Sequence, residues 1–151
     1  MTTLARPRDM ADIVTRLKTV HPDSAPRWGR MSAHQMICHV SDALRMAMGE
    51  RRVSPATGPL QRTIVKWLVL YVPVRWPAAI PTRPEIDQEA GGTKPADFAR
   101  DLAQLESLLA RVATLQRTSW PAHPIFGRMS QQAWRRWAYL HTDHHLRQFG
   151  A

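Results

Sequence analysis

The sequence predicts an all-α protein, and three observations lead to this fold class. Apolar residues recur every three to four positions in several segments, as on the buried face of a helix. No segment shows the two-residue alternation that marks a half-buried strand. Proline-rich stretches, which interrupt helices, separate the periodic segments. We therefore expect residues 1–151 to form a single domain, a bundle of four long helices with an additional short helix and long Pro-rich loops.

The composition is that of a globular protein with one core. Of the 151 residues 44% are hydrophobic, and six are tryptophans, which we expect in the core or anchoring loops. The only cysteine, Cys38, excludes an intrachain disulfide and a Cys-based zinc framework, and is expected to be a small buried hydrophobe. Residues 1–10 lack the apolar run of a signal peptide, so the expected location is cytoplasmic.

Basic residues exceed acidic ones by nine, and most of them are arginines. Such a balance raises the question of a nucleic-acid partner. The arginines are scattered over nearly every segment, however, without the aromatic interleaving of RNA-binding surfaces. We therefore expect a solvated Arg-rich surface and no nucleic-acid partner. The expected partner is a small-molecule substrate or thiol, without a membrane, and the chain could form a homodimer.

Two helices are predicted in the first third of the chain. The first covers residues 8–20 and ends where His21-Pro22 restricts the backbone. The second begins at Ser32, which forms a capping box with Gln35, and stops at Gly49. A loop of turn-forming residues follows.

The middle of the chain contains its most apolar stretch, residues 60–72. It is too short to span a bilayer, and we expect a buried helix rather than a membrane contact. Prolines at 73, 77, 81 and 84 exclude a regular helix after it, so this part must cross the surface or cover a cavity.

Two further helices complete the predicted bundle. One is capped by Thr93 or Asp97 and runs to about Thr114, with the clearest amphipathic pattern of the sequence. A loop over residues 115–128 leads to the last helix, residues 130–149.

Three of the seven histidines lie close together near the end of the chain. In a helix, His141 and His145 are one turn apart on the face of Trp134 and Ala138, so both imidazoles can reach one ion. His144 lies off that face and is expected to be a bystander, although it could geometrically replace His145.

A short repeat supplies a third candidate ligand. Trp28-Gly29-Arg30-Met31-Ser32 precedes the second helix, and Phe126-Gly127-Arg128-Met129-Ser130 precedes the last one, which predicts the same turn and serine cap at both. Counted from these serines, His39 lies at +7, His141 at +11 and His145 at +15. Offsets that differ by fours give the three histidines a similar direction. A three-histidine metal site and a set of core and capping histidines both fit this pattern.

The remaining polar residues receive weaker assignments. Asp42 and Gln148 are candidates for fixing the imidazole tautomers, whereas Asp143 and Arg147 are expected to be solvated. His34 lies about 140° from His39 on its helix, which favours a surface or capping role. His21 and His123 adjoin prolines and are expected at the surface.

Three motifs carry a family resemblance. Met31-Ser32-Ala33-His34-Gln35-Met36 with the later His39, the segment His123–Ser130, and the ending His144-His145-Leu146-Arg147-Gln148-Phe149-Gly150 resemble the DinB/YfiT-like superfamily, and more narrowly a bacterial branch catalogued as a domain of unknown function. The resemblance implies a DinB-like four-helix bundle that holds a divalent metal through His39, His141 and His145.

The resemblance also implies a function. Three imidazoles leave Zn²⁺ or Ni²⁺ with open positions for water or a thiol. Similar proteins include thiol-dependent transferases, which predicts a thiol S-transferase-like enzyme that uses a low-molecular-weight thiol, with metal-water hydrolysis as a variant. The alternative is a non-catalytic metal-binding or stress-associated module. Catalysis requires a cavity at the three histidines that is open to solvent.

Overall fold

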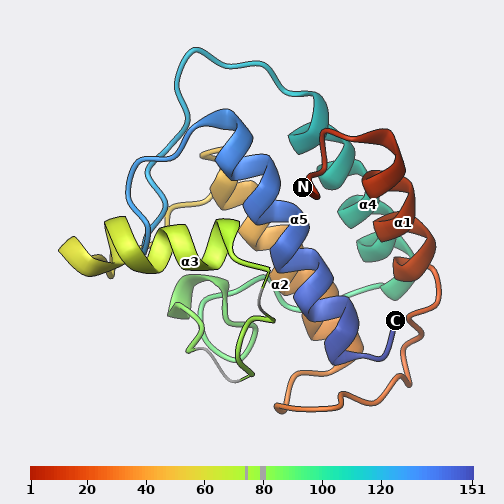
Figure 1. The fold of residues 1–151 in the computed structure, drawn as a ribbon. Coiled ribbons are helices and arrows are strands. Elements are labelled where there is room, and N and C mark those ends of the chain that lie inside the picture. The colour runs from red at the N-terminus through yellow and green to blue at the C-terminus, as the bar shows by residue number, and fades with distance from the viewer. Residues whose placement is uncertain (74, 79–80) are drawn as a thin grey trace.

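A computed structural model describes residues 1–73, 75–78 and 81–151. These residues form five α-helices and no strand, which confirms the all-α prediction (Figure 1). Two short helical turns, a π turn and a 3₁₀ turn, accompany them. In chain order the elements are α1 (Pro7–Leu17), α2 (Ala33–Ala47), the π turn Gln61–Val65, α3 (Lys66–Tyr71), the 3₁₀ turn Pro84–Ile86, α4 (Phe98–Thr114) and α5 (Gln131–Gln148).

The four long helices pack around one core, and α3 is the additional short helix. Helix α2 lies against α4 and α5, α1 lies against α4 and α5, and α3 crosses α5 (Figure 1). Ile37, Leu44, Leu109 and Trp134 are among the fully buried side chains that meet between them. Burial of this apolar surface is the main contribution to the stability of the bundle.

The repeated motif forms the same turn before α2 and α5. Gly29 and Gly127 have φ values of 77° and 65°, in the left-handed region that glycine tolerates best. The cap serines that follow have φ/ψ of −72°/163° and −71°/163°, and each hydroxyl accepts a hydrogen bond of 3.1 Å from the amide three residues later. Ser32 also forms the predicted capping box with Gln35. The predicted twin turn is confirmed.

The structure shortens one predicted helix and identifies the N-terminal cap of another. Helix α1 ends at Leu17 and not at residue 20, because the chain turns there to bring Val20, which is buried, into the core. Of the two candidate caps of α4, Asp97 is the one observed, since its carboxylate accepts from the Arg100 amide. Thr93 instead bonds to Asp42.

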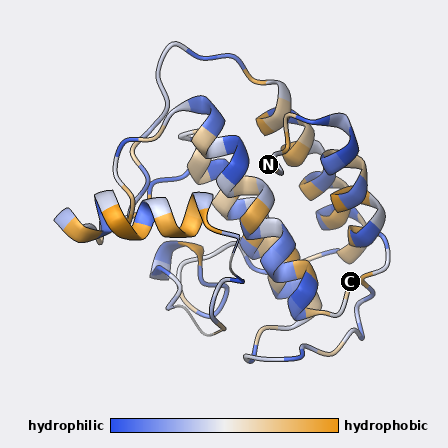
Figure 2. Cartoon of the chain, in the orientation of Figure 1, coloured by the Kyte–Doolittle hydropathy of each residue, from blue (hydrophilic) through white to orange (hydrophobic). Residues whose placement is uncertain are grey.

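The prediction that residues 60–72 form a buried helix is wrong. The segment is helical, as the π turn followed by α3, but only Leu70 is buried. The segment is apolar on two faces, and the bundle covers only the face of Val65, Val69 and Leu70. Its other face projects from the bundle (Figures 1 and 2). No described helix is long and apolar enough to cross a membrane.

Of the two predicted roles of the proline-rich segment after α3, crossing the surface or covering a cavity, the structure shows the second. Trp76, Pro77 and Pro81 line this cavity, and the Trp76 indole N–H donates to the Val69 carbonyl over 3.1 Å. Residues 74, 79 and 80 lie outside the described part of the chain.

Candidate metal centre

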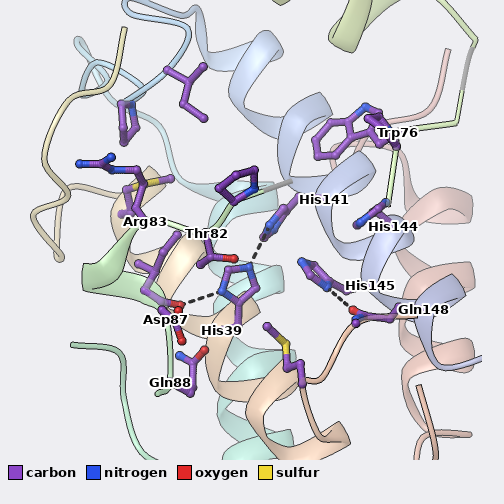
Figure 3. A pocket seen from close by; sticks show the side chains of 18 of the residues that line it. His39, Trp76, Thr82, Arg83, Asp87, Gln88, His141, His144, His145 and Gln148 are labelled. Atoms are coloured by element: carbon purple, nitrogen blue, oxygen red, sulfur yellow. Dashed lines mark hydrogen bonds between the residues drawn. The ribbon is translucent and has the colours of Figure 1, made fainter. Parts of the chain in front are cut away.

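Three imidazoles from two helices converge at the floor of the cavity. His39 comes from α2, and His141 and His145 come from α5 (Figure 3). The three imidazoles are buried, although the His141 residue as a whole is partly exposed. One ring nitrogen of each lies within 4.8 Å of the other two. His39 Nε2 and His141 Nε2 are 3.3 Å apart. These three residues are named the histidine cluster below.

Hydrogen bonds outside the cluster fix two of the rings. His39 Nδ1 lies 2.8 Å from the carbonyl oxygen of Ile86, which can only accept, so Nδ1 carries the ring proton. His145 Nδ1 donates in the same way to Gln148 Oε1 over 2.9 Å, while Gln148 Nε2 donates to the Trp28 carbonyl. Both rings therefore keep a lone pair on Nε2. This outer-partner arrangement is the usual one for metal-binding histidines.

His141 has no such outer partner among the described residues. Its Nδ1 is buried without a hydrogen bond to any of them, and its ring stacks on Trp137 at a centroid distance of 4.7 Å with an interplanar angle of 11°. Because His39 Nε2 carries a lone pair, its 3.3 Å contact with His141 Nε2 requires either a proton on His141 or a cation near both nitrogens. The cluster thus fits a divalent ion of the Zn²⁺ or Ni²⁺ type, which neutral imidazoles suit.

Burial keeps the cluster neutral. It lowers the pKa of His39, and it lowers the pKa values of His141 and His145 well below the ordinary range, where the neighbouring histidines act in the same direction. Neutral imidazole is the form that binds metals.

Of the two residues expected to orient the imidazoles, Gln148 bonds to the cluster and Asp42 does not. The fully buried Asp42 carboxylate accepts from the Thr93 amide at 2.8 Å, the Thr93 hydroxyl at 2.7 Å and Gln88 Nε2 at 3.1 Å. These bonds fix the loop that follows Ile86, whose carbonyl takes the place expected of Asp42. Asp42 therefore influences His39 only indirectly, by holding the loop next to the Ile86 carbonyl that accepts from His39 Nδ1.

His144 stands beside the cluster and outside it. Its ring lies between Trp28 and Trp76, at centroid distances of 5.6 and 5.9 Å, and it lines the cavity (Figure 3). Asp143 bonds to Arg16 and Arg147 in partly exposed ion pairs. The structure thus places His145, and not His144, with His39 and His141.

The expectation that His123 lies at the surface is wrong. Only 5% of the residue is exposed, because its ring stacks on Phe126 and lies against Trp134 and Trp137. Its Nδ1 accepts hydrogen bonds from the backbone amides of Ile125 and Phe126, and burial lowers the pKa of His123 to about 3. The signal in the sequence was its place just before the Gly-Arg-Met-Ser turn, with which its backbone pairs at Gly127. His21 is exposed, as expected.

A second group of ligating side chains lies between α2 and α4. His34 Nε2 is 2.8 Å from Asp101 Oδ2, and the buried Cys38 Sγ is 3.8 Å from the same oxygen. His34 is therefore a half-buried partner of Asp101, not the expected surface or capping residue. We name His34, Cys38 and Asp101 the second cluster.

The cavity above the histidine cluster has a volume of about 550 Å³. Exposed residues, Arg30 and Pro77 among them, line it together with the cluster, so it reaches the surface. Its walls are mainly apolar and aromatic, with contributions from Trp28, Trp76 and Trp137. This composition is typical of sites for small molecules.

Comparison with known proteins gives a family and no activity. A family model described as "Protein of unknown function (DUF1569)" matches residues 6–151. No curated protein and no solved structure matches the chain.

Proposed function

The chain belongs to the DUF1569 family of proteins of unknown function, and we propose that it is a DinB-like divalent-metal protein with thiol S-transferase-like activity. One observation carries the proposal: three buried imidazoles direct ring nitrogens at one point on the floor of a 550 Å³ cavity. A purely structural metal would require neither the cavity nor free coordination positions.

His39, His141 and His145 would hold the ion, with Ile86 and Gln148 fixing two of the rings. A divalent ion bound there would supply Lewis-acid chemistry, which favours the deprotonated form of a thiol or of water. In the reaction, the thiol loses its proton to solvent and its sulfur forms a bond to an electrophilic carbon. The leaving group departs with the electron pair of the bond that breaks.

The chain's own residues suit both reactants. The tryptophans of the cavity wall offer contact area to an apolar electrophile and exclude water from the reacting atoms. Arg30 and Arg83 also line the cavity and suit the carboxylates of a peptide-like thiol. Zn²⁺ and Ni²⁺ are the ions most compatible with an all-imidazole set.

The test combines metal analysis with a transfer assay. We expect natively purified protein to carry about one divalent ion per chain, and His141→Ala to carry none, whereas His21→Ala, which changes an exposed histidine, matches the wild type. Metal-loaded wild type should conjugate a thiol such as glutathione to a chromogenic aromatic halide, and His141→Ala should not.

Two outcomes would change the conclusion. Stoichiometric metal without transfer or hydrolysis of any tested compound would leave a non-catalytic metal-binding or stress-associated module. If the wild type carries no ion and chelator leaves its stability unchanged, the proposal fails.

A further inference from the structure

The face of residues 60–71, which include the π turn and α3, that the bundle leaves uncovered is a continuous apolar stripe. In the described part of the chain, every strongly exposed large apolar side chain except Met1 belongs to it. Its members are exposed to between 41% and 58%: Leu60, Ile64, Trp67, Leu68 and Tyr71. Isolated apolar side chains are common on protein surfaces, but a contiguous patch of this kind marks an interaction site. Figure 2 shows the apolar colouring along this projecting helix.

The charges around the stripe are of one sign. Between Glu50 and Glu85 the sequence contains no aspartate and no glutamate. Arg62 and Arg75 are exposed on and just after the segment, and Lys66 lies beside exposed Arg128, to whose carbonyl it donates. The stripe is therefore bordered by cations, in a chain whose overall charge is already +9.

Although no membrane partner was expected from the sequence, we propose that this apolar stripe docks on the surface of an anionic lipid membrane. Leucine, isoleucine and tryptophan on one side of a helix and basic residues beside them are the features of helices that lie in the plane of a membrane interface. Trp67 and Tyr71 are amphipathic rings that favour the headgroup level. The basic border adds attraction to acidic lipids.

The charge pattern favours a membrane over a second copy of the chain. In a dimer packed stripe to stripe, the cationic borders of the two copies would repel each other. An anionic headgroup layer would instead neutralise the cationic border of a single copy. The membrane also suits the position of the cavity, since Val65 and Val69 on the opposite face of the same segment line it. Docking would bring the cavity close to apolar compounds dissolved in the bilayer.

Vesicle co-sedimentation of the full chain tests the proposal. We expect binding to vesicles of phosphatidylcholine with phosphatidylglycerol, little binding to phosphatidylcholine alone, and weaker binding as salt is raised. The double substitution Ile64→Asn with Trp67→Ser should lower the partition coefficient about tenfold or more, since it removes two anchoring side chains.

Matched charge variants separate the basic border from the net charge. Arg62→Glu with Arg75→Glu should lower binding about tenfold at low salt. Arg8→Glu with Arg100→Glu makes the same change in net charge on α1 and α4, at exposed positions away from α3, and should lower binding less than about twofold. His141→Ala should bind like the wild type, so this test is independent of the metal.

Absence of binding to the anionic vesicles would overturn the proposal. So would equal losses in the two charge-reversal pairs, because binding would then follow net charge alone. A concentration-dependent dimer that Trp67→Ser dissociates, without vesicle binding by the wild type, would assign the stripe to a second copy of the chain.

Discussion

Helix α2 contributes to two groups of side chains that could hold a metal ion: His39 joins His141 and His145, whereas His34 and Cys38 join Asp101. In the histidine cluster, hydrogen bonds run outward to Ile86 and Gln148 and leave lone pairs pointing inward. In the second cluster, His34 and Cys38 direct their polar atoms at the same Asp101 oxygen.

The difference shows that proximity alone does not define a metal site. A ligand must also be deprotonated and free of a competing partner. Burial and the nearby carboxylates of Asp101 and Asp42 raise the pKa of Cys38 to about 11, so its thiol stays protonated at neutral pH. The imidazoles of the histidine cluster are neutral, and the outside hydrogen bonds of His39 and His145 are made by Nδ1 and leave Nε2 for an ion. We therefore expect the two clusters to respond differently to substitution.

The largest effect is expected from a ligand. His141→Ala should abolish binding of Zn²⁺ in calorimetric titration, whereas His34→Ala, which removes a histidine of the second cluster, should leave one ion per chain. Chelator should lower the melting temperature of the wild type and of His34→Ala only, because only they are stabilised by a bound ion. The reverse pattern would move the site to the second cluster.

An outer partner of the cluster should have an intermediate effect. Gln148→Ala removes the acceptor of His145 Nδ1 and should weaken metal affinity by about 10- to 100-fold. Gln148→Glu keeps an acceptor at this position but loses the donor to the Trp28 carbonyl, and should restore most of the affinity. Competition with a chromophoric chelator measures both. Equal metal affinities of the wild type, Gln148→Ala and Gln148→Glu would show that the His145 ring needs no hydrogen-bond acceptor at Nδ1.

The buried, neutral His123, which lies outside the histidine cluster, should make the stability of the fold depend on pH. Because its pKa is about 3 in the fold and near 6.5 when unfolded, the unfolded chain binds more protons between these values, and stability falls as pH falls below 6.5. His123 alone should lower the free energy of unfolding by about 2 kcal/mol between pH 7 and pH 5.

Urea denaturation at pH 7 and pH 5 measures this cost. His123→Asn keeps an acceptor for the Ile125 and Phe126 amides and should lose less stability on acidification than the wild type, with unchanged metal content. Parallel losses in the two proteins would assign the acid sensitivity elsewhere.

The smallest effect is expected in the second cluster. Cys38→Ser nearly preserves size and should lower the free energy of unfolding by about 1 kcal/mol, because a buried thiol contact is replaced. Metal content by mass spectrometry should not change. Loss of an equivalent of metal in this variant would contradict the distinction between the clusters.

Much of the bundle and the convergence of the three histidines could be predicted from the sequence, because both depend on local signals. The Gly-Arg-Met-Ser turns set the starts of α2 and α5, and the offsets of His39, His141 and His145 from them set a common direction. Helix periodicity acts over neighbouring turns and is readable without knowledge of the fold.

The errors concern contacts that only the assembled chain defines. Residues 60–72 are apolar on two faces, and the sequence does not tell that the bundle covers one of them. His123 lies in a proline-flanked loop, yet three aromatic rings bury it. The Ile86 carbonyl that orients His39 comes from a backbone position, for which no residue type gives a signal.

X-ray absorption at the metal edge of the zinc-loaded full chain tests the central claim most directly, because it reads the ligand atoms themselves. The histidine cluster predicts only nitrogen and oxygen ligands at about 2.0–2.1 Å, with the outer-shell scattering of imidazole rings. A sulfur shell at about 2.3 Å would place the ion at Cys38 in the second cluster and contradict the account.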